Sequence, residues 1–466
     1  MDGEPNLLAS LWPTLDRPRR PIALGEPTMT WTDLRSASEV VLGTLERNDA
    51  RNVMLACRDR FHVAAGLIAT WARGGAAVFP SAPKAQIAVT QAQKARADVI
   101  LSDDGEIGLS IADLLRAPTA DRQRPLPAAP RFTSNHRLAT VFTSGSTGTP
   151  VRCDKTVAQL MGEALFISRF FQIDQAATVL ALAPPHHLYG LLFGVLAPLA
   201  GGACFIRMSS PLPDAIAKQS SRHQATVICA VPAHLDGFAV IRPEQLRSVR
   251  RIFCSGGRMD PGTSSKLRER FPFPVIEVFG SSETGGIAYR ESGVSGGWTP
   301  LDGVTVTADA GGRLLLSSPF LPAGVQRPYV SNDLIAGDPD GTFRHLGRYD
   351  EIIKIAGERV SVPEVEHHLR AIPGVVDAAV IKTATAAPRL WELWAAVVAP
   401  TLSESAIRRA LSRSLEPVAT PRRFRLVTSL PREESGKLVQ QSLLALFESS
   451  ESDLDARPSS VDKRLS

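Results

Sequence analysis

Short apolar runs rich in β-branched residues alternate with helical patterns along the first part of the chain, and this alternation most constrains its fold. Runs at residues 52–56 and 76–79 flank a helical pattern at 63–72. Further apolar runs lie at residues 99–101, 140–143, 226–230, 251–254 and 275–279. Strands separated by helices form parallel sheets whose faces the helices cover. The sequence therefore predicts an α/β fold with layered, mostly parallel sheets.

The pattern changes beyond residue 300. Residues 304–317 alternate around Gly311 and Gly312, which predicts a hairpin in a small β subdomain. Residues 363–427 then follow the order helix, strand, strand, helix and strand, enough for a small α+β domain. A chain of 466 residues also exceeds the roughly 250–300 residues of a single core. We expect an N-terminal domain at 1–347, a hinge at 348–351, a C-terminal domain at 352–448 and a disordered tail at 449–466.

Charge and cysteine content narrow the class of protein. The net charge of +5 is carried by scattered arginines, which suits a nucleotide or an acidic partner and does not require nucleic acid. The five cysteines are far apart and form no Cys-x-x-Cys pair, so we expect a reducing, cytoplasmic location without disulfides or a structural metal. The first residues, with Asp2 and Glu4, do not form a signal peptide. Residues 189–206 are uncharged, but glycines and Pro198 break them into a short helix and a core strand, which argues against a membrane span.

A loop rich in glycine and hydroxyl side chains follows the apolar run at 140–143. The segment from Val141 to Lys155 reads VFTSGSTGTPVRCDK. Its candidate phosphate-binding residues are Thr143, Ser144, Gly145, Ser146, Thr147 and Gly148. Glycine lets backbone N–H groups approach an anion closely, and hydroxyls add further donors. The loop lacks the Gly-Lys-Ser/Thr of a Walker A motif, and taken alone a solvated turn explains it equally well.

Six further segments with motif-like composition follow this loop along the chain. They are HLYG at 187–190, FGSSET at 279–284, YVSND at 329–333, GRYDEIIK at 347–354, VPEVE at 362–366, and the segment from Leu430-Pro431 to Ser435-Gly436-Lys437. Over residues 30–445 the chain resembles the acyl-adenylate-forming superfamily of acyl-CoA synthetases, peptide synthetase adenylation domains and firefly luciferase. The resemblance implies a large AMP-binding domain followed by a small mobile one.

The resemblance also implies a two-step reaction. A carboxylate attacks the α-phosphate of ATP to give an acyl-adenylate and pyrophosphate, and a thiol then displaces AMP to form a thioester. Lys437 would bridge the carboxylate and the α-phosphate, although without the motif it is an ordinary surface lysine. Glu283 would serve Mg²⁺, and Ser282 would contact the α-phosphate. ATP and Mg²⁺ are therefore the expected cofactors.

The remaining nucleotide contacts follow from the same resemblance. Asp333 would accept hydrogen bonds from the ribose hydroxyls, with Arg348 as its companion. On local grounds Asp333 is also explained as a turn residue after Asn332. Gly256 and Gly257 would lie beside the adenine and the acyl group, and a plain strand-to-helix turn explains them equally well.

The acyl group and the thiol would be handled elsewhere. His187, Tyr189 and Gly190 would line the acyl pocket, while a histidine in an apolar run is also a common core residue. Asp350 would be the hinge at which the small domain turns between the half-reactions. Gly357 would lie on the path of the thiol, where a side chain would obstruct it.

The sequence departs from the family pattern in two segments. Val151 and Arg152 replace the Lys-Gly that usually follows the loop proline, so the nearest lysine is Lys155, and Gln440 replaces a terminal arginine. The first change removes one charge near the β- and γ-phosphates. The loop followed by Lys155-Thr156 resembles a compact subgroup from aryl-polyene and xanthomonadin pigment pathways, which is thought to load hydroxybenzoate-type acids onto an acyl carrier protein.

The expected function is an ATP-dependent ligase that adenylates 3- or 4-hydroxybenzoate and transfers it to the phosphopantetheine thiol of an acyl carrier protein in pigment biosynthesis. An acidic carrier would be steered by six arginines, although these are equally explained as a solvated surface: Arg408, Arg409, Arg413, Arg422, Arg423 and Arg425. The alternatives are an aryl- or medium-chain acyl-CoA ligase that uses free CoA, and a non-catalytic adenylate-binding protein. The sequence leaves open the acid, the acceptor, the oligomeric state and the effect of Val151 on ATP use.

Overall fold

The computed structural model describes residues 7–8, 12, 20–82, 84–117, 125–143, 151–257, 259–294, 296–349, 352–355, 358–384, 391–433 and 438–448. These residues form two compact units. The first unit runs to Leu346, and the second begins at Gly347. The tail predicted to be disordered, residues 449–466, lies outside the described residues.

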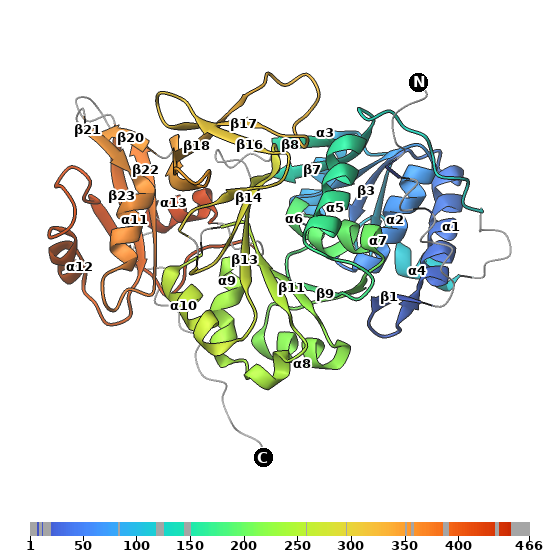
Figure 1. Cartoon of the computed structure of the whole chain (residues 1–466), viewed down its shortest axis with the longest axis horizontal. Helices are drawn as coiled ribbons and strands as arrows, with labels where there is room; N and C mark the ends of the chain where they lie inside the picture. Colours follow the sequence, from blue (N-terminus) through green and yellow to red (C-terminus); the bar gives the residue numbers. More distant parts are fainter. Residues whose placement is uncertain are drawn as a thin grey trace, which may run out of the picture. The chain divides into compact units, whose positions relative to one another are not determined.

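A six-stranded sheet forms the first layer of the larger unit. Its strand order is β6-β5-β3-β4-β7-β8, in which only the β7–β8 pair is antiparallel. The strands are β3 (Asn52–Ala56), β4 (Ala76–Phe79), β5 (Val99–Ser102), β6 (Leu109–Ser110), β7 (Arg137–Thr143) and β8 (Val151–Thr156). The helices of this layer are α1 (Trp31–Arg47), α2 (Arg60–Ala72), α3 (Ala85–Ala95), α4 (Ile111–Arg116) and α5 (Val157–Phe170) (Figure 1).

A nine-stranded sheet forms the second layer. Its order is β15-β14-β13-β12-β11-β9-β10-β1-β2, and the six strands from β13 to β1 are mutually parallel. The strands are β1 (Pro21–Leu24), β2 (Met29–Thr30), β9 (Thr178–Ala181), β10 (Cys204–Ile206), β11 (Val227–Ala230), β12 (Arg251–Cys254), β13 (Val275–Ser281), β14 (Gly285–Glu291) and β15 (Thr299–Pro300). Helices α8 (Pro213–His223), α9 (Pro232–Leu235) and α10 (Pro261–Arg270) accompany them. The prediction of layered, mostly parallel sheets is confirmed.

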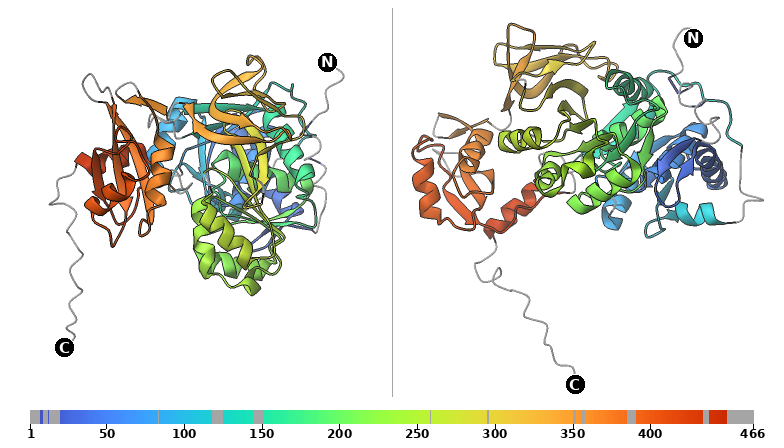
Figure 2. Two further views of the ribbon diagram at one scale, coloured as in Figure 1. Left: turned by 60° about the vertical axis from the view of Figure 1, so that its left-hand side comes forward. Right: turned by 60° about the horizontal axis from the view of Figure 1, so that its bottom comes forward.

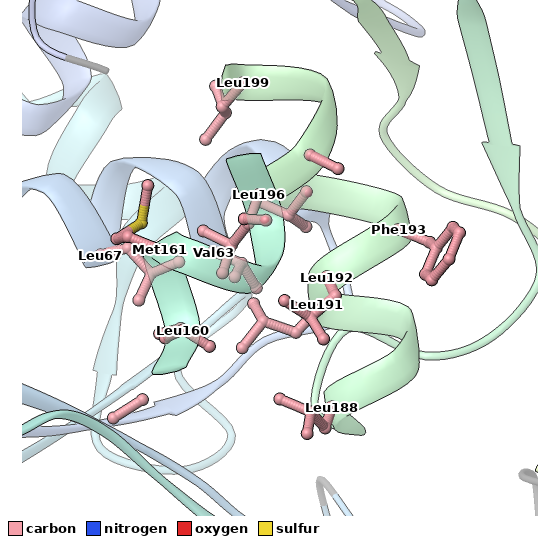
Figure 3. Close-up of a cluster of buried hydrophobic side chains, with 14 of the residues drawn as sticks. Val63, Leu67, Leu160, Met161, Leu188, Leu191, Leu192, Phe193, Leu196 and Leu199 are labelled. Carbon is pink, nitrogen blue, oxygen red and sulfur yellow. The ribbon is translucent and has the colours of Figure 1, made fainter. Parts of the chain in front are cut away.

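The uncharged stretch at 189–206 lies in the core. It forms α6 (Leu188–Leu191), a π-helical turn (Leu192–Leu196), α7 (Ala197–Gly201) and then β10. Figure 3 shows its leucines gathered with Val63 and Leu67 of α2 and with Leu160 and Met161 of α5. The assignment of this stretch to the core is confirmed, and among the described residues no helix is long and apolar enough to cross a membrane.

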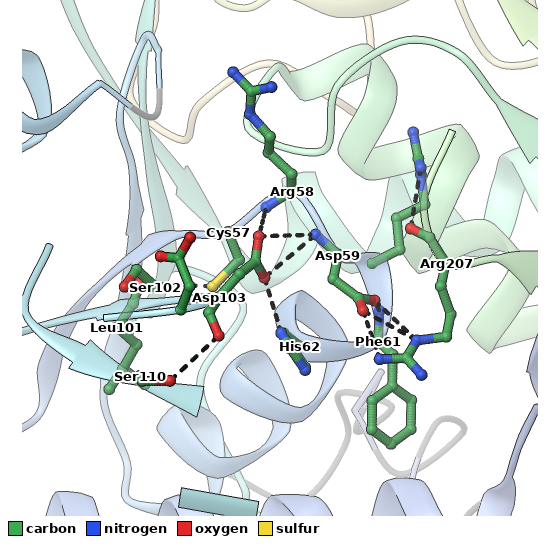
Figure 4. A network of polar contacts seen from close by, with 12 residues as sticks. Cys57, Arg58, Asp59, Phe61, His62, Leu101, Ser102, Asp103, Ser110 and Arg207 are labelled. Carbon is green, nitrogen blue, oxygen red and sulfur yellow. Dashed lines mark hydrogen bonds and ion pairs between the residues drawn. The ribbon is translucent and has the colours of Figure 1, made fainter. Parts of the chain in front are cut away.

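Polar contacts join the two sheets beside this core. Asp59 caps the start of α2 by accepting from the Phe61 N–H, and it also binds the guanidinium of Arg207, which follows β10, at 2.6 Å (Figure 4). The buried guanidinium of Arg60 donates to the carbonyl oxygens of Ala181 and Ala183 at the end of β9. Both contacts link a helix of the six-stranded sheet to strands of the other sheet.

A second polar group lies at the end of β5. The carboxylate of Asp103 accepts from the Arg58 N–H at 2.7 Å and contacts His62 Nδ1 at 2.8 Å (Figure 4). Burial raises the pKa of Asp103, but the hydrogen bonds from His62 and the Arg58 N–H outweigh it and hold the pKa below the ordinary 3.8. This carboxylate therefore stabilises the turn between β3 and α2 in its ionised form.

A four-stranded sheet completes the larger unit, in the order β16-β17-β18-β19. The strands are β16 (Thr305–Ala308), β17 (Arg313–Ser317), β18 (Tyr329–Gly337) and β19 (Phe343–Arg348). β16 and β17 are antiparallel, with Gly312 at a φ of +80° in their turn. The predicted hairpin around Gly311 and Gly312 is confirmed.

The smaller unit contains the predicted order helix, strand, strand, helix and strand, and it adds two strands before this series and one helix after it. Its elements are β20 (Ile352–Ile355), β21 (Glu358–Ser361), α11 (Val362–Arg370), β22 (Asp377–Ala384), β23 (Trp391–Val398), α12 (Glu404–Leu411), β24 (Arg423–Leu426) and α13 (Gln440–Glu448). α11 packs on β22, and the strands pair in the order β22-β23-β24. Figure 2 shows the elements of this unit in orange and red. The helix expected at 404–415 ends earlier, at Leu411, because residues 412–415 close into turns.

Candidate active site

The carboxyl ends of β9, β11, β12 and β13 lie at one edge of the nine-stranded sheet, because these strands are parallel. The segments that follow them begin at Leu182, Val231, Ser255 and Ser282. Ligands of open α/β sheets bind at this edge. The sequence motifs at 187–190, 256–257 and 282–283 all follow strands of this group.

A tight turn at the end of β13 presents Ser282 and Glu283. Ser281 and Thr284 hold it closed, since the Thr284 N–H donates to Ser281 Oγ and the Ser281 N–H donates to Thr284 Oγ1, both at 3.2 Å. Thr284 is buried whereas Glu283 is exposed. The turn therefore fixes the backbone and leaves the Glu283 carboxylate accessible.

The glycine- and hydroxyl-rich loop begins where β7 ends, at Thr143. Thr143 pairs with Val151 of β8, so the loop joins two antiparallel neighbours. Cys153 of β8 donates from Sγ to the carbonyl oxygen of Ser282 at 3.1 Å. The C-terminal side of the loop thus lies beside the Ser282 turn, although the two come from different sheets. Ser144, Gly145, Ser146, Thr147 and Gly148 lie outside the described residues.

Two buried ionisable side chains lie behind this turn. Glu163 of α5 accepts a hydrogen bond from the Gly286 N–H at 2.7 Å, and burial raises the pKa of Glu163 although Lys155 opposes the shift. Gly285 has a φ of +72°, and a Cβ there would lie 2.8 Å from Glu163 Oε2. Lys155 is 1% exposed, and its Nζ has no hydrogen-bond partner among the residues that the structure describes. Lys155 shares a strand face with Cys153, because successive side chains of a strand alternate.

Asp333 lies within β18 rather than in a turn, so the local explanation as a turn residue is wrong. Its Oδ2 accepts from Ser331 Oγ at 2.5 Å, and its Oδ1 lies 3.0 Å from His345 Nε2. The His345 ring contacts Phe279 of β13, with 5.1 Å between the ring centroids. Asp333 is therefore held close to the strand that ends in the Ser282 turn.

The glycines after β12 have ordinary surroundings. Gly256 has a φ of +85°, which favours glycine. Cβ atoms built at Gly256 and Gly257 would lie 3.5 Å from the side chains of Val231 and Pro232. These contacts leave both the turn explanation and the proposed nucleotide contact open.

Two residues of the HLYG segment are fixed by packing. Tyr189 donates its hydroxyl to the Phe253 carbonyl oxygen at 2.9 Å, and burial raises the pKa of Tyr189 well above its ordinary value. A Cβ at Gly190 would lie 2.0 Å from the Pro184 carbonyl oxygen, so only glycine fits there. Tyr189 and Gly190 thus fix the backbone of this segment through contacts with the core, where Tyr189 packs on Phe193.

The two histidines before α6 differ in burial. His187 is half-buried at the start of α6, and its ring lies 4.4 Å from that of His186. His186 is buried, and burial lowers its pKa well below the ordinary value. The core explanation therefore fits His186, which sequence reasoning did not single out.

The contacts described above do not include four of the predicted residues. Arg348 is the last residue of β19 and belongs to the second unit. Asp350, Gly357 and Lys437 lie outside the described residues, and their roles stay predictions.

Glu283 fits a magnesium ion as a single ligand. The described residues contain no group of three or more His, Cys, Asp or Glu side chains able to hold a metal. Mg²⁺ in nucleotide enzymes is usually bound through one or two carboxylates together with phosphate oxygens and water. The exposed carboxylate of Glu283 could serve as one such ligand.

Known protein families account for most of the chain. The profile of the AMP-binding enzyme family matches residues 16–313, and that of the AMP-binding enzyme C-terminal domain matches residues 364–437. The chain belongs to the AMP-binding enzyme family. This AMP-binding enzyme is an adenylate-forming ligase of the acid–thiol type.

Curated relatives of this AMP-binding enzyme include ligases for several acids. It is 28% identical over 379 residues to sulfoacetate–CoA ligase of Cupriavidus necator, covering 73% of this chain and 74% of that protein. It is 31% identical to a probable 2-succinylbenzoate–CoA ligase of Mycobacterium tuberculosis, covering 66% of this chain and 84% of that protein. It is 29% identical to p-hydroxybenzoic acid–AMP ligase of the same species, covering 65% of this chain and 48% of that protein.

Solved structures share the fold over nearly the whole chain. ATP-bound MatB of Rhodopseudomonas palustris aligns with a TM-score of 0.82 at 20% identity and covers 95% of this chain and 99% of its own. O-succinylbenzoate coenzyme A synthetase of Bacillus subtilis, solved with AMP, aligns with a TM-score of 0.81 at 20% identity. The alignment covers 94% of this chain and 98% of that one. The predicted fold class, with a large N-terminal and a smaller C-terminal part, is confirmed.

Sequence reasoning missed three residues that support the site: Cys153, Glu163 and His345. The alternation of β8 places Cys153 on one face together with Lys155, but it does not show what that face meets. Glu163 lies within the apolar helix α5, where a lone carboxylate is a weak signal of a buried contact. His345 could have been noticed as a polar residue at an inward strand position beside exposed Leu346.

Proposed function

We propose that this enzyme uses ATP and Mg²⁺ to adenylate an aromatic acid of the hydroxybenzoate class, and then transfers the acyl group to the phosphopantetheine thiol of an acyl carrier protein. The convergence of the Val151 side of the loop, the Ser282 turn and Asp333 around the end of β13 carries the adenylation part. The p-hydroxybenzoic acid–AMP ligase among the relatives supports the aromatic acid.

The chemistry of the first step is chiefly positioning and charge neutralisation, since a carboxylate must approach a phosphate. In this proposal the backbone of the loop and the Ser282 hydroxyl hold the α-phosphate, and Asp333 holds the ribose. Glu283 would bind Mg²⁺, which supplies positive charge to the phosphate oxygens when present. Lys437 would join the acid carboxylate to the α-phosphate.

The arginines of the smaller unit support a carrier protein as acceptor. Arg408 stacks over Phe424 at 4.4 Å and donates to the Arg422 carbonyl oxygen at 2.8 Å, and Arg423 lies over Trp394 at 4.4 Å. These two side chains are held by their own unit. Arg409 and Arg413 are exposed on and just after α12, where an acidic partner would meet them.

Free CoA is the second candidate acceptor, and the relatives named as CoA ligases favour it. The two acceptors differ in their need for a protein surface. An Arg409→Glu/Arg413→Glu variant should therefore slow transfer to an acidic carrier by about ten-fold at low salt and leave transfer to CoA unchanged. An Arg242→Glu/Arg247→Glu variant of the larger unit makes the same change of charge and serves as the control.

Acid-dependent ATP–pyrophosphate exchange tests the adenylation step. Benzoic, hydroxybenzoic, cinnamic and fatty acids would be compared as substrates. In a Lys437→Ala variant the rate of exchange should fall about a hundred-fold or more. Exchange with hydroxybenzoates supports the proposal. Exchange with fatty acids alone would exclude the aromatic substrate, and exchange with no acid at all would favour the non-catalytic alternative.

A further inference from the structure

His345 and Asp333 form a close pair on the neighbouring strands β19 and β18. Nε2 of His345 lies 3.0 Å from Oδ1 of Asp333, and Ser331 Oγ donates to Oδ2 at 2.5 Å. The side chains are 28% and 14% exposed, respectively. Each carboxylate oxygen thus has its own partner, and two partners on different oxygens fix the plane of the carboxylate.

The histidine ring packs on one aromatic ring, which two further rings support. Its ring contacts Phe279 at 5.1 Å, and Phe279 contacts Trp298 at 5.4 Å and Phe343 at 6.1 Å. These rings come from β13, the segment before β15, and β19. His345 therefore has little freedom to turn away from Asp333.

The pattern of β19 is inverted at this point. Phe343 is buried and His345 is half-buried on the same strand face, whereas Leu346 is 55% exposed. A strand on one side of a core normally turns apolar residues inward and polar residues outward. Packing alone does not favour a histidine turned inward next to an exposed leucine.

We propose that His345 is a positioning residue which, by donating from Nε2 to Asp333, holds this carboxylate in the orientation that accepts the ribose hydroxyls of the nucleotide. The inference rests on the proposed function, because Asp333 must meet a nucleotide. An oriented carboxylate loses less conformational freedom on binding, and its hydrogen bonds to hydroxyls are charge-assisted. The effect of His345 should therefore depend on the hydroxyl groups of the ligand.

A binding cycle with AMP and 2′,3′-dideoxy-AMP tests this dependence by calorimetry. His345→Leu removes the donor, His345→Gln keeps an amide donor, and Asp333→Asn alters the acceptor itself. His223→Leu, at the last residue of α8, is the matched control because it lies before β11, at the opposite edge of the sheet. Thermal unfolding of each variant shows that the protein is folded.

His345→Leu should weaken AMP binding by about ten-fold, the order of one hydrogen bond to a charged group. The same change should leave the affinity for 2′,3′-dideoxy-AMP within about two-fold, and His345→Gln should recover most of the AMP affinity. An equal loss for both ligands, or no loss for AMP, would overturn the inference. Failure of the wild-type protein to bind AMP at all would instead contradict the proposed function.

Discussion

The thiol of Cys153 and the carbonyl oxygen of Ser282 lie 3.1 Å apart, and this contact joins the edge of the six-stranded sheet to the turn after β13. Burial raises the pKa of the Cys153 thiol, which therefore stays protonated and able to donate. The strand that follows the glycine- and hydroxyl-rich loop is thus coupled to the turn whose Ser282 we propose binds the α-phosphate.

Replacing Cys153 should change ATP handling more than stability. Cys153→Val removes the donor at similar volume, so the KM for ATP should rise on the order of five-fold, as for one weak hydrogen bond. Cys153→Ser keeps a donor and should stay close to wild type. Pyrophosphate exchange at varied ATP concentration measures the KM of both variants. An unchanged KM in the valine variant would show that the contact does not position the turn.

The buried carboxylate of Glu163 should make stability depend on pH. Burial raises its pKa above the ordinary 4.5, so the folded state holds the proton more tightly than the unfolded chain does. The protonated Glu163 therefore contributes fully to the free energy of unfolding below about pH 4.5. This contribution is lost as the pH rises through the raised pKa of the folded state. Glu163→Gln keeps an acceptor for the Gly286 N–H and should gain stability relative to wild type between pH 4.5 and 8.

Urea unfolding of wild type and Glu163→Gln across this range measures the difference. A relative loss for the glutamine variant with rising pH would mean that Lys155 stabilises the ionised carboxylate more than burial penalises it. In that case Glu163 and Lys155 would act as a buried ion pair.

Asp103 should have the opposite dependence. The pKa of Asp103 lies below 3.8, so its contribution is present above that pH and is lost as the pH falls through the lowered value. Asp103→Asn should cost about 1–3 kcal/mol of unfolding free energy at pH 7. The difference from wild type should shrink below pH 3.8, which acid titration of the unfolding midpoint would detect. A constant difference would show that shape rather than charge matters at this position.

Two glycines offer a matched test of packing. A Cβ at Gly190 would lie 2.0 Å from the Pro184 carbonyl oxygen, whereas a Cβ at Gly162 in α5 meets nothing within 4 Å. Gly190→Ala should destabilise the protein by more than about 2 kcal/mol through displaced backbone. Gly162→Ala should stabilise it by up to about 1 kcal/mol, because alanine favours the helix. Thermal unfolding compares the two, and equal effects would contradict this account.

The sequence predicted most of the secondary structure because buried strands and amphipathic helices have simple periods. The runs at 52–56, 76–79 and 251–254 became strands with those same bounds. Ends were less accurate: β13 continues to Ser281, since its last residues pair with Gly285 and Gly286 of β14. That pairing depends on the turn itself, which no periodicity reveals.

The site was predicted from motifs residue by residue, but not its supporting contacts. The Cys153–Ser282 bond joins residues from different sheets, and the His345–Asp333 pair depends on how β18 and β19 lie beside each other. Such contacts leave no local pattern in a chain. The structure also shows that Tyr189 serves the core with its hydroxyl bonded to Phe253, which the motif alone did not indicate.

Arg60 seals the interface between the two sheets, with its guanidinium donating to backbone oxygens of Ala181 and Ala183. A small separation of the sheets would break these hydrogen bonds before water could reach the guanidinium, so partial opening is disfavoured. The two layers should then behave as one cooperative folding unit. Amide hydrogens of α2 and β9 are accordingly expected to exchange with deuterium together, in the slowest class, and only through global unfolding.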